Sequence, residues 1–452
     1  MRKLFFVLAI ASLSVSLFIS CKKDESDKEE IQEKDKDVKI YLKPVIDDIY
    51  YWYNKVPKNI DRTPLDIFTY FDTLLYKTED RWSWMMTGEE FLNDEQGISV
   101  GYGVEIVQAI DYYKDYGIRV AVVYPNSPFA QNGVQRGWEL TKINGTPVMT
   151  LIINEKFNAE IQKSSNTFTF NDLNGTEKTF TVTAQTYTSR SVLTSKIFTN
   201  DDFSGLSAPV GYIHYSTFNA KMLSDIDDVM GQFKSAGVTN VILDLRYNSG
   251  GDEDACIHLA NYIAPESANN QILSKYKHNN QNSKYDSNTA STIKREAGAL
   301  NLATLYVISG KYTASASEVI INGLKPLMNV VQVGQTTYGK PAGMYVIPYP
   351  ENDYDSPDYV FLPICFMVVN KDGNGDYLNG IVPNNYRADD VFHDFGKDED
   401  LINACLTHIK SGVFPQLPAV MSTKSAKKDI AHSLPERRIK SLYKAKLIRK
   451  NQ

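Results

Sequence analysis

The sequence predicts an α/β protein with a parallel β-sheet at its core, preceded by a small β domain and a helical region. Residues 189–412 alternate buried strands with amphipathic helices, which is the pattern of βαβ units. Residues 96–188 consist of short alternating runs between Gly, Asn and Pro turns, the pattern of a β domain. Residues 38–95 show helical periodicity and many aromatic side chains, so we expect a small helical N-terminal region.

The composition is that of a globular protein and gives no indication of nucleic-acid binding. Of the 452 residues, 42% are hydrophobic and 23% charged, with a formal net charge of −6. Beyond the leader, the cysteines are odd in number and fit no zinc site: Cys256, Cys365 and Cys405. The loop at residues 370–375 lacks the final glutamate of an EF-hand, because Ile381 holds that position. The sequence therefore predicts no metal and no cofactor.

The N-terminus has the layout of a signal peptide over residues 1–20. Arg2 and Lys3 precede an apolar run at residues 4–19, which is short for a membrane-spanning helix. Residues 18–21 resemble a bacterial lipobox, and this resemblance implies cleavage before Cys21 and lipidation of its thiol. The alternative is an ordinary signal peptide with an incidental cysteine.

A lipidated Cys21 predicts a protein anchored to a membrane of the bacterial cell envelope. The charged residues that follow resemble the export tag of surface lipoproteins, so we expect the outer membrane, on its periplasmic or its surface face. Residues 21–37 are polar without periodicity and are predicted to form a flexible tether. Residues 413–452 are basic and are predicted to be a disordered tail, with a binding role as the alternative.

Three loops leave predicted parallel strands at their carboxyl ends, which meet at one edge of the sheet. The second of these loops ends at Ser315 and the third at Lys340, while the predicted helix at residues 316–327 carries the chain back between them. We therefore expect Ser315 and Lys340 to meet. The loops follow strands at residues 241–245, 304–308 and 330–333.

The chemistry of this pair is that of an activated nucleophile. A serine needs a base, no Ser/His/Asp arrangement is apparent, and a desolvated lysine with a lowered pKa can serve. The glycine turn at residues 248–251 and the Ala316 N–H at the helix start favour an oxyanion hole. Each residue alone has another interpretation: Ser315 as the helix cap paired with Glu318, and Lys340 as a solvated surface lysine.

Residues 127–148 resemble the helix and following strand of a PDZ domain, with Trp138 where aspartate is usual. The resemblance implies that Tyr102, Gly103 and Val104 form the loop whose backbone N–H groups hold a peptide's terminal carboxylate. The alternative is a generic β domain with glycine turns.

Four motifs together resemble the carboxyl-terminal processing (tail-specific) serine peptidases, whose relatives include the tricorn core proteases. They lie at residues 244–251, 313–318, 339–340 and 380–383. The resemblance implies a crotonase-like fold, Ser315 as nucleophile and Lys340 as general base. It implies an oxyanion hole made by backbone N–H groups of Ala316 and of Gly250 or Gly251. The sequence departs from the family at Met344, where many members carry a glutamine that helps to orient the lysine.

The leading hypothesis is a serine endopeptidase that cleaves exported proteins near their C-termini, guided by a PDZ groove. A second hypothesis is a catalytically inactive lipoprotein that only binds peptides, which the substitution at Met344 leaves open. A third, a crotonase-like acyl-CoA enzyme, is disfavoured by the signal peptide and the PDZ-like segment.

Overall fold

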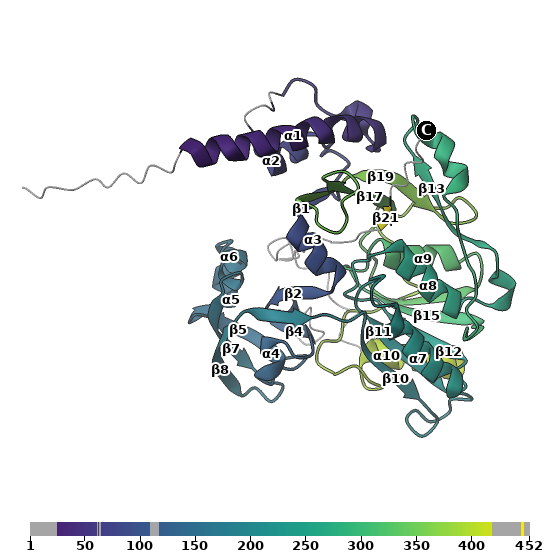
Figure 1. The fold of residues 1–452 in the computed structure, drawn as a ribbon. Helices are drawn as coiled ribbons and strands as arrows, with labels where there is room; N and C mark the ends of the chain where they lie inside the picture. The colour runs from purple at the N-terminus through teal and green to yellow at the C-terminus, as the bar shows by residue number, and fades with distance from the viewer. Residues whose placement is uncertain (1–24, 61, 63–64, 109–116, 418–443, 447–452) are drawn as a thin grey trace, which may run out of the picture.

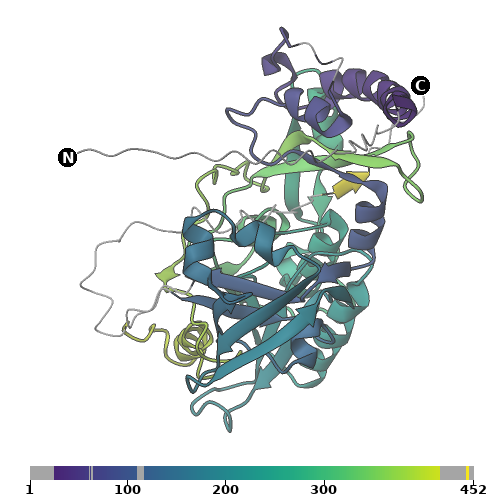
Figure 2. The same cartoon turned by 90° about the vertical axis from the view of Figure 1, so that its left-hand side faces the viewer.

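The computed structural model describes residues 25–60, 62, 65–108, 117–417 and 444–446, and Figure 1 shows their arrangement. Cys21 and the predicted signal peptide lie outside these residues. Two large sheets stack along the molecule, and a separate antiparallel unit stands beside them (Figures 1 and 2). Within the described ranges, no helix has the length and apolar character that a transmembrane span requires.

The central sheet has six strands in the order β10-β11-β12-β15-β16-β20, and every pairing after the first is parallel. The three strands predicted to carry the site are confirmed and lie side by side in it. The strands are β10 (Val192–Phe198), β11 (Val210–Tyr215), β12 (Asn240–Asp244), β15 (Thr304–Ser309), β16 (Asn329–Gly334) and β20 (Asn385–Tyr386).

Helices cover both faces of this sheet. One face packs against α7 (Leu223–Ser235), α8 (Glu253–Ile263) and α9 (Ala316–Leu324) in one hydrophobic core. The other face packs against α10 (Asp400–Ser411) in a second core. The crossover β15–α9–β16 returns the chain to the same sheet edge, as the sequence predicts.

A second sheet of seven strands lies above the first and contains the strand that begins just after Lys340. Its order is β1-β18-β17-β19-β13-β14, with β21 pairing parallel to β17. The helices α1 (Glu25–Ile49) and α2 (Ile67–Thr73) lie over it (Figure 1). The strands are β1 (Trp84–Thr87), β13 (Ile272–His278), β14 (Ser291–Thr292), β17 (Ala342–Tyr349), β18 (Tyr359–Leu362), β19 (Ile364–Val369) and β21 (Lys444–Lys446).

The antiparallel unit has its own aromatic core and is joined to the rest by two paired strands. Its strands run in the order β3-β4-β5-β7-β8, and β6 pairs with β5. The entering strand β2 (Ile98–Gly101) pairs with the leaving strand β9 (Gln185–Thr188). The other elements are β3 (Val104–Gln108), β4 (Ile118–Val123), α4 (Pro128–Gln131), β5 (Glu139–Ile143), β6 (Thr146–Pro147), α5 (Val148–Ile153), α6 (Phe157–Ile161), β7 (Ser165–Asn171) and β8 (Glu177–Thr183).

Two predictions about the chain ends are wrong in part. Helix α1 begins at Glu25, within the predicted flexible tether. The helix continues into residues that pack in the core, so tertiary contacts extend it. The strand Lys444–Lys446 lies in the predicted disordered tail, where an edge of β17 pairs with it.

A buried ion network fixes the end of β12. The Arg246 guanidinium donates to Asp244, at 2.7 Å, and to Glu399, at 2.6 Å, and all three side chains are at most 1% exposed. Arg246 also donates to Asp389 at 2.9 Å. The Arg246 charge helps to hold the pKa of Asp244 at about 2, against the opposing effect of burial.

Replacing Arg246 with methionine is expected to lower the free energy of unfolding by about 3–5 kcal/mol, because two buried carboxylates lose their shared partner. Chemical denaturation measures this loss. The control is Lys142→Met, which removes a solvent-exposed pair with Glu177 and is expected to change stability by less than about 1 kcal/mol. Equal effects in the two variants would contradict the structural role of the network.

Candidate active site

Ser315 stands at the sharp turn between β15 and α9 in a strained conformation. Its φ of 54° and ψ of −116° are rarely adopted by a residue with a side chain. The side chain is 1% exposed, and among the described residues its Oγ has no hydrogen-bond partner. The predicted capping box is therefore half formed, since only the Glu318 carboxylate bonds, to the Ser315 N–H. The strain and the unpartnered hydroxyl are typical of a nucleophile.

Glu318 joins the loop of Ser315 to the loop of Lys340. Its buried carboxylate accepts hydrogen bonds from the N–H groups of Ser315, at 2.9 Å, and of Lys340, at 2.8 Å. It also accepts from the Gly339 N–H at 2.8 Å and the Thr337 hydroxyl at 2.6 Å. Burial raises the pKa of Glu318, and these four donors oppose that rise. Sequence reasoning assigned Glu318 only a local cap, so its link to the lysine loop was missed.

Lys340 is buried, not solvated. Its side chain is 1% exposed, and burial lowers the pKa of its ammonium to about 7, against the opposing effect of the Asp80 and Glu318 carboxylates. Nζ lies 3.8 Å from the sulfur of Met344, the residue that replaces the expected glutamine. Ser315 and Lys340 share one buried site through Glu318, although no hydrogen bond joins their side chains in this conformation.

The glycine turn lies directly against Ser315. A Cβ placed on Gly250 would be 2.9 Å from the Ser315 Cβ, so a residue with a side chain does not fit there. The turn is fixed by Asn248, whose carbonyl oxygen accepts from the Ala314 N–H at 3.2 Å. The same asparagine accepts the Gly250 N–H through its side chain, at 2.8 Å.

The structure distinguishes between the two glycines that were expected as oxyanion donors. The Gly250 N–H is already bonded to Asn248. Phe218 forms a parallel bridge with Gly251: its carbonyl accepts from the Asp252 N–H, and its N–H donates to the Gly250 carbonyl. In this arrangement the Gly251 N–H points away from Phe218. The Ala316 N–H is in the first turn of α9 and has no intrahelical acceptor. The geometry therefore favours Gly251 with Ala316.

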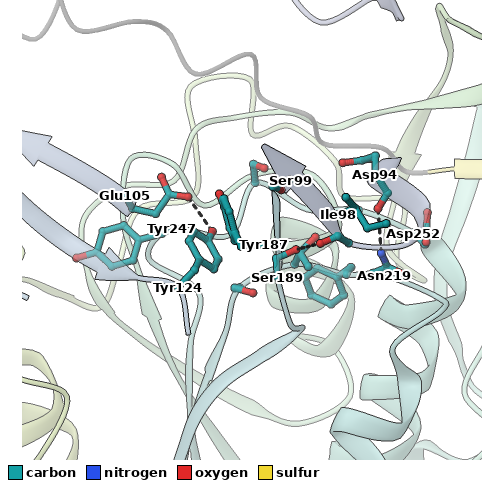
Figure 3. A pocket seen from close by; sticks show the side chains of 16 residues that line it. Asp94, Ile98, Ser99, Glu105, Tyr124, Tyr187, Ser189, Asn219, Tyr247 and Asp252 are labelled. Carbon is teal, nitrogen blue, oxygen red and sulfur yellow. Dashed lines mark hydrogen bonds between the residues drawn. The ribbon is translucent and has the colours of Figure 1, made fainter. Parts of the chain in front are cut away.

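A cavity of about 350 Å³ connects this turn to the antiparallel unit (Figure 3). The core contributes Tyr247 and Gly251, and the antiparallel unit contributes Glu105 and Tyr124. The Tyr124 hydroxyl donates to Glu105 at 2.8 Å. The ring of Tyr187 packs against that of Tyr124, with centroids 5.5 Å apart. The cavity thus has walls from both parts of the protein.

Arg136 of the antiparallel unit reaches into the core beside the glycine turn. It donates to the Tyr247 hydroxyl at 3.0 Å and to the backbone carbonyl of Asp390 at 2.7 Å. Its guanidinium also lies over the Phe395 ring, 4.3 Å from the centroid. Sequence reasoning missed this residue, because an arginine in a turn carries no signal of contacts that lie 111 and 254 residues away along the chain.

The loop predicted to hold a carboxylate is firmly fixed. The Tyr102 side chain is 6% exposed and packs between Phe129 and Phe168. The Gly103 carbonyl accepts from the Tyr124 N–H at 3.0 Å, and Val104 begins β3. A ligand at this loop can therefore contact the backbone of the loop but not the buried Tyr102 side chain.

Replacing Gly250 with alanine is expected to lower the rate at which a fluorophosphonate labels Ser315 by at least about ten-fold, because the new methyl group displaces the Ser315 side chain. Labelling is followed by mass spectrometry. The control is Gly133→Ala, which also has a positive φ but leads into open space, so labelling should stay near that of the parent. Unchanged labelling in the Gly250 variant would show that the turn does not shape the site.

Two family models match this sequence. The model of peptidase family S41 matches residues 209–363, which include the glycine turn, Ser315 and Lys340. The model of the peptidase S41 N-terminal domain matches residues 42–84.

Curated relatives agree with these matches. The chain is 30% identical over 218 residues to the carboxyl-terminal-processing protease of Synechocystis sp., covering 47% of each chain. It is 22% identical over 320 residues to the carboxy-terminal processing protease CtpA of Bacillus subtilis, covering 69% of this chain and 61% of that one. The chain thus spans between about half and three-fifths of the length of these relatives.

A solved structure shares the fold. The crystal structure of a protein from Bacteroides fragilis assigned to the S41 proteases superposes with a TM-score of 0.63 at 24% identity. The superposition covers 82% of this chain and 97% of that one. The mixed α/β fold described above is therefore that of an S41 protease. Together, the two family models and the curated relatives show that residues 42–84 and 209–363 of this chain are similar to peptidase family S41.

Proposed function

We propose that this protein is a serine endopeptidase of the C-terminal processing type, with Ser315 as nucleophile and Lys340 as general base. The observation that carries the proposal is the Glu318 carboxylate, which holds a strained, unpartnered serine and a buried lysine in one site. A lysine whose pKa is about 7 is largely neutral at slightly alkaline pH and can accept a proton.

The reaction proceeds in two steps, acylation of Ser315 and hydrolysis of the acyl-enzyme. Neutral Lys340 takes the proton of Ser315 Oγ, which attacks the peptide carbonyl carbon, and the amide N–H groups of Gly251 and Ala316 receive the oxyanion. The Lys340 ammonium then protonates the leaving amine, and an acyl-enzyme remains. Lys340 then takes a proton from a water molecule, which attacks the acyl carbon; the bond from that carbon to Ser315 Oγ breaks, the acid leaves, and the Lys340 ammonium returns the proton to Oγ. The hydrogen bond between serine and lysine forms as substrate closes the site, since such bonds are often long in a free enzyme.

Two features support a polypeptide as the substrate. The cavity beside the glycine turn opens between the core and the antiparallel unit, where an extended chain can pass. The edge of β17 that begins just after Lys340 already pairs with an extended segment, because Met344 and Val346 are in register with Lys444 and Lys446. An edge that accepts one strand suits recognition by strand addition.

The antiparallel unit supports recognition of C-termini. We assign residues 96–188 as a PDZ-like domain and residues 189–412 as a crotonase-like peptidase core. In this assignment the backbone of Tyr102, Gly103 and Val104 binds the terminal carboxylate of an exported protein. The cavity then leads the chain towards Ser315.

Ser315→Ala and Lys340→Met are both expected to abolish hydrolysis of C-terminal peptides, while the chains stay folded. In the parent, kcat/KM should rise with pH around a midpoint near 7, because only neutral Lys340 accepts a proton. The measurement is peptide turnover by residues 22–452 between about pH 5 and 9. Turnover that survives in both variants would eliminate the Ser–Lys pair.

The second candidate is a peptide-binding lipoprotein without catalysis, favoured by the missing hydrogen bond between Ser315 and Lys340 and by Met344. It predicts that the parent binds peptides with free C-termini but hydrolyses none of them. Binding by calorimetry without turnover would support this candidate, and turnover by the parent would exclude it.

We place the protein in the bacterial cell envelope, anchored by lipid on Cys21 to the outer membrane. The support is the lipobox-like sequence at residues 18–21. Cys21→Ser is expected to move the full-length protein from the detergent phase to the aqueous phase in Triton X-114 partition. Cys405→Ser, a buried free cysteine, is the control and should stay in the detergent phase. Detergent partition that persists in Cys21→Ser would contradict lipidation.

A further inference from the structure

Met344 cannot fix the orientation of the Lys340 amine, because a thioether sulfur is a weak acceptor. The described residues offer another source of orientation. The segment that immediately precedes β1 belongs to the N-terminal region, yet it contacts the lysine loop. We propose that the turn of Asp80 and Arg81 positions Lys340. Arg81 fixes the loop that carries the lysine, and the Asp80 carboxylate attracts the lysine's amino group electrostatically. This inference rests on the proposed function, since it assigns a role within the same site.

Arg81 bridges two loops that meet at the lysine. Its guanidinium donates to the carbonyl of Gly339, at 3.1 Å, and to the carbonyl of Leu378, at 2.9 Å. The Tyr338 ring flanks the guanidinium, with the centroid 5.1 Å away. Gly339 directly precedes Lys340, and a Cβ there would lie 2.4 Å from the Leu378 carbonyl oxygen. The loops of Gly339 and Leu378 are thus in contact, with no room for a side chain at Gly339. Arg81 holds them together through hydrogen bonds to both carbonyls.

Asp80 is a fixed, buried acceptor. One carboxylate oxygen accepts the N–H groups of Trp82 and Ser83, both at 2.9 Å, and the other accepts the Tyr50 hydroxyl at 2.8 Å. The side chain is 2% exposed, so little solvent screens its charge. These three hydrogen bonds fix the position of the carboxylate.

Asp80 directly precedes Arg81, whose guanidinium donates to the carbonyl of Gly339, the residue before Lys340, so the turn brings Asp80 to the lysine loop. Burial lowers the pKa of the lysine, and Asp80, followed by Glu318, raises it. From the elements around the amine, the carboxylates that act on it are therefore Asp80, before β1, and Glu318, in α9. The titratable groups bordering Asp80 are the Tyr50 hydroxyl and the buried Cys365 thiol, and burial raises the pKa of each.

The test uses paired variants within the N-terminal region. Arg81→Met is matched by Arg62→Met, because Arg62 also donates to backbone carbonyls, those of Pro57 and Thr73. We expect Arg81→Met to lower kcat by about ten-fold or more with little change in KM, since the base is misplaced. Arg62→Met should leave kcat near that of the parent. Equal kcat in the two variants overturns the role of Arg81.

The second test variant is Asp80→Asn, and its control is Asp66→Asn. In the parent, the Asp66 carboxylate also accepts two backbone N–H groups, those of Phe68 and Thr69. Removal of the Asp80 charge makes Lys340 lose its proton more easily. The midpoint of the pH dependence of Ser315 labelling by a fluorophosphonate should therefore fall by about 0.5–1 pH unit. Asp66→Asn should leave the midpoint unchanged. A purely structural role would lower stability in Asp80→Asn without moving the midpoint, and that result overturns the proposal.

A second readout needs no reactivity. Between the folded pKa of Lys340 and its higher unfolded value, the unfolded chain binds more protons, so stability rises with pH in that window. The parent and Lys340→Met are compared in how their free energy of unfolding rises with pH. The difference between them reports the pKa of Lys340 in the folded protein. In Asp80→Asn the onset should move to lower pH, even if no peptide is cleaved. Failure of peptide cleavage alone would thus refute the proposed function, and an unmoved onset would refute this inference.

Discussion

The Glu318 carboxylate is the interaction on which the site depends. A buried carboxylate is costly unless hydrogen bonds replace its lost water, and four donors do so here. Two of the donors are the backbone N–H groups of Ser315 and Lys340. Because the two loops come from opposite ends of the crossover through α9, neither can relax without leaving the charge short of a donor. The carboxylate thus couples the strained backbone of Ser315 to the position of Lys340.

Opposing effects act on both Lys340 and Ser315. Burial alone would drive the Lys340 pKa far down, and the nearby carboxylates limit that fall to about 7. Ser315 occupies a strained conformation that the packed glycine turn maintains. Strain and buried charge both oppose folding, so their presence together at one place is a mark of function and not of stability.

Much of the core could be predicted from the sequence, because strand periodicity and topology are local signals. They place Ser315 and Lys340 at one sheet edge, and the structure confirms the strands on which that argument rests. The link through Glu318 could not be predicted, since a helix cap gives no sign of a second loop. The choice of Gly251 over Gly250 depends on where the Asn248 side chain points. Arg81 joins parts of the chain far apart in sequence, and no periodicity encodes such contacts.

The pairing of β2 with β9 has a mechanical consequence. The antiparallel unit is inserted between the two segments that family models recognise, and its entering and leaving strands form one short ladder. Because the entering and leaving strands pair with each other, both covalent connections between the unit and the rest of the chain lie at one place. Away from this junction, the unit is held to the core by non-covalent contacts, among them the hydrogen bond from Arg136 to the Tyr247 hydroxyl. The cavity between the unit and the glycine turn is therefore bordered by one covalent junction and by non-covalent contacts such as that of Arg136.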